Sequence, residues 1–367
     1  MKFNLIFIII IILTLSSCQD DDDNDITDPP IKNGPTAYSL KLPAHFFYIS
    51  TPIIPEDNPL TVEGIALGKK LFFEKKLSKD NSISCGSCHK SENAFSDKGN
   101  AVSRGVGGTL GDRNAMPLFN LAWGSVTSKR FNWHGNSSSI EEQVFFPVTH
   151  PKEMKETWKS VASKLQNDAA YPPLFNAAFE TELIDSMLIS KAIAQFERTL
   201  ISGNSRVDKY VQKEIAGFDI PGGPFLTTQE LRGFDLFENE GKADCAHCHG
   251  TFTNPLWTDN NFVNNGLDAN PDSGLASVTK NPMDLGKFKT PSLRNLVFTA
   301  PYMHDGRFNT IREVVDFYAD DINFNSPNIE AVIVKPRTLT NQERDDLVAF
   351  LEALTDSSFV KNPDFRP

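Results

Sequence analysis

Apolar residues recur at helical spacing in several segments of the chain, and alternating strand patterns are scarce. The clearest segments are 61–73, 189–202, 227–238, 310–318 and 340–355. Residues three or four apart share one face of a helix, so this spacing predicts amphipathic helices. Three of the segments open with a T-x-x-E capping box, which satisfies free backbone N–H groups at a helix start. These boxes begin at Thr227, Thr310 and Thr340. The sequence therefore predicts a mainly α fold.

Long segments rich in Gly, Asn and Pro separate the predicted helices, for example 99–115 and 253–287. Such compositions are typical of loops, because these residues favour turns over helix interiors. A helical scaffold with long loops suits a chain that folds around a large apolar cofactor.

The chain also contains an internal repeat. The stretch GKKLFFEKK in the first half resembles GFDLFENEG in the second, and WHGNSSSIEEQVFFP resembles the stretch that begins MHDGRFNTIREVVDFY. Gly135 aligns with Gly306. In this alignment Pro147 stands opposite Tyr318. The repeat predicts two copies of one module, each with one site.

The N-terminus, MKFNLIFIIIIILTLSSC, has one lysine, an apolar run and small residues before Cys18. The apolar run is too short to span a membrane comfortably, and the pattern predicts a secretory leader at residues 1–17. The ending LSSC resembles a bacterial lipoprotein signal, so we expect cleavage before Cys18 and lipidation of its thiol. The alternative is an ordinary signal peptide followed by a chance cysteine.

Residues 18–42 contain QDDDDNDITDPPIKNGP. Like charges repel and Pro and Gly do not build a core, so we expect a disordered acidic tether. The protein would then be exported and held by its lipid on a bacterial membrane, facing the periplasm or the cell surface.

The rest of the chain suits two domains of ordinary size, which we place at 43–205 and 206–367. The net charge is −11, and no run is rich in Lys or Arg. This argues against a nucleic-acid partner. An acidic surface would favour a basic partner such as a small cytochrome, although the tether supplies part of the charge.

The other four cysteines form two Cys-x-x-Cys-His motifs, CGSCH at 85–89 and CAHCH at 245–249. Such a motif could serve a redox disulfide, half of a zinc site or a covalent haem. A thioredoxin-like disulfide needs a βαβ setting, which the sequence does not predict. A zinc site needs two further ligands near each pair. Cys-x-x-Cys-His is the attachment motif of c-type haem, and export and repetition both favour it.

We therefore predict two covalently bound haem c groups. The residues that would hold them are Cys85 and Cys88 with His89 on the iron, and Cys245 and Cys248 with His249 on the iron. Function then depends on the second axial position of each iron, because an open iron does chemistry and a closed one transfers electrons.

Three stretches carry a resemblance to a known family: LGKKLFFEKKLSKDNSISCGSCH, FNWHGNSSSIEEQVFFPVTHPKEM and KTPSLRNLVFTAPYMHDG. Together they resemble the di-haem bacterial cytochrome c peroxidases and their relatives, the MauG proteins. The resemblance runs over most of the chain after the tether. It implies two cytochrome-c-like domains with one haem each and a calcium ion between them, and it makes a homodimer an expectation.

The resemblance also implies that haem 1, at 85–89, reduces peroxide and that haem 2, at 245–249, accepts electrons from a donor. The residues that match the family's site are Gln143, Pro147 and Glu153 above haem 1, Trp133 between the haems, and, for calcium, Asn114 with the backbone carbonyls of Thr299 and Pro301. Glu153 would act as the general acid–base and Gln143 would orient the peroxide.

One departure from the family lies in the loop VSRGVGGTLGDRN. Peroxidases that need reductive activation carry a histidine there that caps haem 1. This loop has none, and Val106 stands near the equivalent place. Haem 1 is therefore expected to be open when both irons are ferric.

The second departure concerns haem 2. Tyr318 stands where typical peroxidases present a methionine ligand, and MauG also has a tyrosine there. Met303 and Met283 are other candidate ligands. Tyr318 also shares an apolar face with Ile311 and Val314, so a buried core tyrosine is the competing interpretation.

The sequence thus predicts a cytochrome-c-peroxidase-like oxidoreductase that reduces hydrogen peroxide with electrons from a small cytochrome or copper protein. One alternative is a MauG-like oxidase of a protein or other substrate that uses a His/Tyr-ligated second haem. A second alternative is a non-catalytic cytochrome that transfers electrons or senses peroxide.

Overall fold

The computed structural model of the 367-residue chain describes residues 34–124, 130–335 and 337–367. The expected leader, Cys18 and most of the expected tether lie outside the described residues. Gly34–Pro367 forms one compact unit. No helix within the described ranges is long and apolar enough to cross a membrane.

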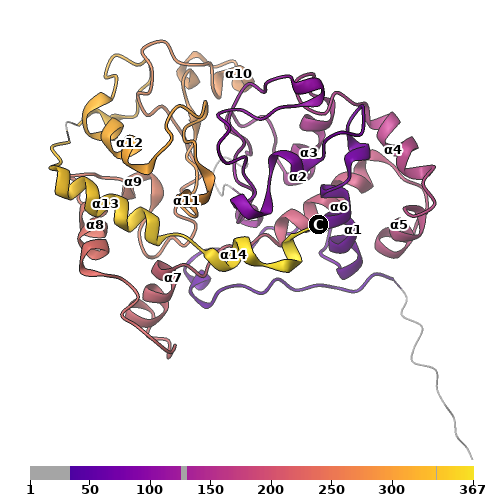
Figure 1. The fold of residues 1–367 in the computed structure, drawn as a ribbon, viewed down its shortest axis with the longest axis horizontal. Helices are drawn as coiled ribbons and strands as arrows, with labels where there is room; N and C mark the ends of the chain where they lie inside the picture. Colours follow the sequence, from indigo (N-terminus) through magenta and orange to yellow (C-terminus); the bar gives the residue numbers. More distant parts are fainter. Residues whose placement is uncertain (1–33, 125–129, 336) are drawn as a thin grey trace, which may run out of the picture. The chain divides into compact units, whose positions relative to one another are not determined.

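The described part of the chain is mainly helical, as predicted (Figure 1). The helices are α1 (Val62–Phe72), α2 (Cys85–Cys88), α3 (Ile140–Thr149), α4 (Trp158–Gln166), α5 (Pro172–Phe179), α6 (Ser186–Arg198), α7 (Arg206–Tyr210), α8 (Thr228–Glu238), α9 (Ala246–His249), α10 (Ala276–Thr279), α11 (Leu296–Thr299), α12 (Ile311–Asp316), α13 (Asn341–Ala353) and α14 (Ser357–Lys361). Each of the five periodic segments overlaps one helix: α1, α6, α8, α12 or α13. The strands β1 (Phe262–Val263) and β2 (Phe288–Lys289) pair antiparallel, with Phe262 opposite Lys289.

The predicted capping boxes are present at the starts of α8, α12 and α13. In each box the threonine side chain accepts a hydrogen bond from the third helical N–H, and the glutamate carboxylate at that position accepts one from the backbone N–H of the threonine. The helix that starts at Thr310 ends unusually, because α12 continues as a π-helical turn over Phe317–Asp321. Such turns are rare and frequent at functional sites, and this one carries Tyr318.

The internal repeat is visible in helix packing. Helix α1 packs on α6, and α8 packs on α13. A glycine allows each close crossing: a Cβ atom at Gly68 would lie 1.9 Å from the carbonyl oxygen of Ala192, and one at Gly233 would lie 2.0 Å from that of Asp346. The matching stretches GKKLFFEKK and GFDLFENEG therefore have the same packing role, a close helix crossing at a glycine, in both halves.

Equivalent loops of the repeat form equivalent turns. An isolated antiparallel bridge joins Phe131 to Ser137, and another joins Tyr302 to Phe308. These pairs coincide in the alignment that places Gly135 on Gly306. The repeat is thus structural, while the boundary between modules at 205 and 206 remains a prediction.

Two large apolar clusters form the core. One gathers side chains between Leu67 and Leu200, and the other gathers side chains between Val207 and Leu354. The C-terminal helix α14 returns to the first cluster, where Phe359 packs against Phe95 with ring centroids 5.9 Å apart. The C-terminal end of the chain therefore helps to hold its halves together.

Candidate active site

The first Cys-x-x-Cys-His motif forms the short helix α2 and the residue after it. His89 Nδ1 lies 2.9 Å from the carbonyl oxygen of Phe95. A histidine that donates its Nδ1 proton to a carbonyl presents Nε2 to a metal in a fixed orientation. Burial lowers the pKa of His89, which favours the neutral imidazole that binds iron. Cys85, Cys88 and His89 line a cavity of about 310 Å³, here called the first cavity.

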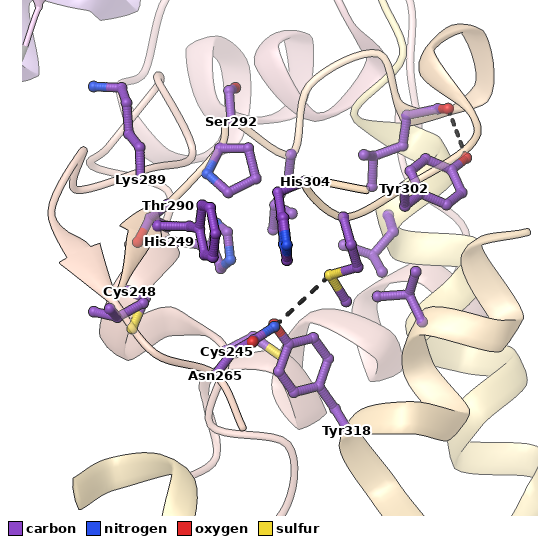
Figure 2. Close-up of a pocket in the computed structure, with 18 of the residues that line it drawn as sticks. Cys245, Cys248, His249, Asn265, Lys289, Thr290, Ser292, Tyr302, His304 and Tyr318 are labelled. Atoms are coloured by element: carbon purple, nitrogen blue, oxygen red, sulfur yellow. Dashed lines mark hydrogen bonds between the residues drawn. The ribbon is translucent and has the colours of Figure 1, made fainter. Parts of the chain in front are cut away.

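The second motif repeats this arrangement on α9. His249 Nδ1 lies 3.2 Å from the carbonyl oxygen of Trp257, and burial again lowers the pKa of the imidazole. Cys245, Cys248 and His249 line a separate cavity of about 190 Å³, here called the second cavity. Figure 2 shows these three side chains on its wall.

The two motifs fit haem attachment better than the alternatives. All four motif cysteines are free thiols, and burial raises the pKa of each. Redox-active cysteines have lowered pKa values instead. In the described ranges no group of three or more His, Cys, Asp and Glu side chains is arranged to hold a metal ion, so a zinc site around either pair lacks ligands.

Helix α3 forms the wall of the first cavity that carries the predicted peroxide site. Gln143 and Pro147 are one turn apart, and Glu153 follows in the turn after the helix; all three line the cavity. Proline offers no side-chain atom that can ligate iron. The structure thus brings the three predicted residues to one cavity with His89, although the roles of all four remain predictions.

Glu153 has an environment suited to proton transfer. Burial raises the pKa of its carboxyl group; His150 lowers that pKa and Asp112 raises it. His150 Nδ1 lies 3.5 Å from Glu153 Oε1, and its Nε2 lies 3.9 Å from Asp112 Oδ2. The sequence interpretation missed His150 and Asp112, which also line the first cavity. His150 stands three residues before Glu153 in the sequence, and this proximity could have predicted their contact.

The loop without histidine packs beside this wall. The backbone N–H of the buried Val106 donates to the carbonyl oxygen of Glu153 at 2.9 Å, and Lys155 Nζ donates to the carbonyl oxygen of Val106 at 3.0 Å. Besides His89, the histidines that line the first cavity are His134 and His150. Both come from outside the 101–115 loop, so an open haem 1 depends on these two side chains as well.

Trp133 lines both cavities. Its indole N–H donates to the carbonyl oxygen of Asn114 at 2.9 Å. Its own carbonyl oxygen accepts from the backbone N–H of Lys289, in the second half, at 2.9 Å. The predicted tryptophan therefore lies in the wall that the two cavities share.

The predicted calcium ligands also come together. Asn114, Thr299 and Pro301 all line the second cavity. The backbone N–H of Asn114 donates to the carbonyl oxygen of His304 at 2.8 Å, which ties the loop after α2 to the loop after α11. Oxygen ligands of this kind suit calcium, and the ion itself remains a prediction.

The far side of the second cavity holds the candidate ligands of haem 2. Tyr318 lines it together with Ile311 and Val314, and Met303 lines it as well. Met283 is 63% exposed and does not line it. Burial raises the pKa of Tyr318 to about 12, although a hydrogen bond from Asn265 lowers it. The ring of Tyr318 also packs against a buried apolar cluster that includes Phe317, so it is both part of the cavity wall and part of the core, and its ligand role stays a prediction.

Comparison with known proteins agrees with this geometry. Residues 62–216 match the family model described as di-haem cytochrome c peroxidase. The methylamine utilization protein MauG of Methylorubrum extorquens is 37% identical over 303 residues, which cover 82% of this chain and 80% of the relative. The cytochrome c peroxidase Ccp of Escherichia coli is 32% identical over 308 residues, covering 82% of this chain and 60% of the relative.

Among solved structures, a MauG-like protein associated with microbial copper homeostasis matches with a TM-score of 0.78 and 36% identity, covering 90% of this chain and 99% of that one. The chain belongs to the di-haem cytochrome c peroxidase and MauG family. The predicted family and the predicted class, a cytochrome-c-peroxidase-like oxidoreductase, are confirmed. Membership implies two haem c groups. Relatives carry both names, so the choice between peroxidase and MauG-like activity needs a separate argument.

Proposed function

We propose that the protein is a peroxidase that reduces hydrogen peroxide to two water molecules, using two protons and two electrons from a small redox protein. One observation carries the proposal: the two Cys-x-x-Cys-His cavities share a wall at Trp133, and the first of them also holds an acid–base group, Glu153. A site for peroxide chemistry thus borders a second redox site. Relatives named cytochrome c peroxidase support the same activity.

In the first cavity, Cys85, Cys88 and His89 would hold haem 1, which when bound supplies the iron on which peroxide is reduced. Glu153 takes a proton from one peroxide oxygen and returns it to the leaving oxygen, as a general acid–base. A raised pKa suits this role, because the group must both accept and donate a proton near neutral pH. Gln143 orients the peroxide by hydrogen bonding, and Pro147 leaves the binding position free.

In the second cavity, Cys245, Cys248 and His249 would hold haem 2, and Tyr318 would supply a further ligand from the same cavity. Trp133 provides the path for electrons between the two cavities. The donor docks on the second half and delivers its electrons there. The peroxidase relatives imply a cytochrome as the donor, and we propose a small copper protein as the alternative donor.

A MauG-like oxidase is the second candidate function. The observation that favours it is Tyr318 in the second cavity, because a tyrosine ligand lowers the reduction potential relative to methionine and makes the site a poorer acceptor. The electrons would then come from a residue of a protein substrate. Relatives named MauG support this alternative.

We also propose export, lipid anchoring, a calcium site and a homodimer; the leader and Cys18 lie outside the described residues. The chain would be exported, cleaved after residue 17 and lipidated at Cys18, and it would face the periplasm or the cell surface. A calcium ion would bind at Asn114, Thr299 and Pro301, and the protein would form a homodimer.

Stopped-flow absorbance of the fully ferric protein mixed with peroxide tests the proposal. We expect a rapid spectral change without prior reduction, because the 101–115 loop carries no capping histidine and Pro147 cannot ligate iron. Adding a reduced small cytochrome should then restore the starting spectrum with stoichiometric oxidation of the donor.

Two other outcomes are informative. No reaction until one electron is added would mean that haem 1 is capped, with His134 and His150 as the side chains to replace first. A rapid reaction with peroxide that no cytochrome or copper donor reverses would favour the MauG-like function.

A further inference from the structure

One amide contacts both candidate ligands of haem 2. Asn265 Nδ2 donates a hydrogen bond to Tyr318 Oη at 3.0 Å, and the same nitrogen lies 3.7 Å from Met303 Sδ. Figure 2 shows Asn265 beside Tyr318, on the opposite side of the view from Lys289 and Ser292. All three residues line the second cavity.

The backbone on both sides of Asn265 is held in place, so this residue cannot move easily toward Tyr318 or Met303. Its neighbour Asn264 is buried, and the Asn264 amide donates to Ser326 Oγ at 2.9 Å and to the carbonyl oxygen of Pro327 at 2.7 Å. The next residue, Gly266, has a φ of +74°, and a Cβ there would lie within 2.8 Å of two isoleucine side chains. The turn is therefore fixed on both sides of Asn265.

An N–H donor at this place discriminates between the two ligands. A phenol oxygen is a good hydrogen-bond acceptor, and a thioether sulfur is a weak one. A hydrogen bond to an ionised oxygen is shorter and stronger than a neutral one. The amide consequently holds the Tyr318 oxygen in place by a hydrogen bond, and its contact with Met303 Sδ is longer and weaker.

We propose that Asn265 is the positioning residue that makes Tyr318, rather than Met303, the second axial ligand of haem 2. The inference rests on the proposed function, in which a side chain of the second cavity completes that haem. It adds the residue that selects between the two candidates, and hence sets whether the second site stores oxidising charge or accepts electrons readily.

The test is Asn265→Leu in the full, haem-loaded protein. Leucine is similar in size and has no donor. We expect the tyrosinate features of the ferric spectrum to weaken, a methionine-to-iron charge-transfer band to appear in the near infrared, and the midpoint potential of haem 2 to rise. Asn265→Asp, which keeps the shape and removes the amide donor, should move the spectrum in the same direction.

Met303→Leu serves as the matched control. Alone it should leave the parent spectrum unchanged, and combined with Asn265→Leu it should abolish the new band. Two haems per chain in every variant would show that both attachment motifs are loaded, so that spectra can be compared haem for haem.

Unchanged spectra and potentials in both Asn265 variants would overturn the inference while Tyr318 ligation stood. A parent protein that lacks tyrosinate features, and that Tyr318→Phe leaves unaltered, would instead refute the ligand assignment in the proposed function, and the inference with it. The parent spectrum, compared with that of Tyr318→Phe, separates these two failures.

Discussion

Replacing Glu153 by glutamine is expected to slow the reaction of the ferric protein with peroxide by about 10²- to 10⁴-fold, the usual contribution of a positioned general acid–base. Glutamine keeps the size of the side chain but cannot take the peroxide proton. Glu153 is not part of either haem-attachment motif, so both haems should remain bound. Stopped-flow absorbance under pseudo-first-order peroxide gives the rate, and the haem content of each preparation gives the control for assembly.

Glu156→Gln is the matched control, because this carboxylate lies only three residues further along the chain. Its oxygen lies 2.6 Å from Lys164 Nζ, and it does not line the first cavity. We expect the parent rate in this variant. The parent rate in Glu153→Gln would instead remove Glu153 from the mechanism and turn attention to His150.

The pH dependence of the same rate follows from the direction of the pKa shift. The first proton transfer needs the carboxylate form of Glu153, and burial raises the pKa above the ordinary value of 4.5. The rate should therefore fall as the pH falls through this raised pKa, above the range in which an exposed glutamate titrates. Glu153→Gln should lose this inflection along with the rate.

Local patterns predicted the helices and the haem-attachment residues. Periodicity predicted α1, α8 and α13, because each of these helices buries one face against a partner helix. The spacing of the Cys-x-x-Cys-His motifs was enough to predict haem attachment. Gln143 and Pro147 share a wall since they lie one helical turn apart.

Such local patterns could not predict contacts between loops that are far apart in the sequence. Asp112 meets His150 across a loop without periodicity, and Asn265 meets Tyr318 more than fifty residues away. Neither pair has a spacing that marks it. The return of α14 to the first apolar cluster is likewise a tertiary contact, since its five residues carry no sign of which core they join.

The largest effect on stability is expected at Asp208, a fully buried aspartate in α7. Its carboxylate accepts hydrogen bonds from both terminal nitrogens of Arg294, at 2.6 and 2.7 Å, and its Oδ1 lies 2.8 Å from His45 Nε2. The arginine belongs to the segment whose residues from Thr290 to Leu293 line the second cavity. This network therefore joins the N-terminal segment, α7 and the wall of the haem 2 site.

Asp208→Asn should lower the free energy of unfolding by about 3–5 kcal/mol, because it leaves the buried guanidinium of Arg294 without its counter-charge. Denaturant unfolding of the haem-loaded protein at neutral pH measures the loss. Asp345→Asn is the control: the aspartate is exposed, its partner Arg312 is half-buried and keeps a second partner in Asp316, and such exposed ion pairs contribute about 0–1 kcal/mol.

Acid sensitivity gives the same network a second, independent test. Burial alone would raise the pKa of Asp208, but Arg294 and His45 hold it well below the ordinary value. A carboxyl whose pKa is lowered by folding contributes stability above its unfolded pKa of about 3.9, and that contribution is lost as the pH falls below it. The parent should therefore lose stability below about pH 4 more steeply than Asp208→Asn. Equal slopes, or equal losses in Asp208→Asn and Asp345→Asn at neutral pH, would show that the charge of Asp208 does not hold the second cavity's wall in place.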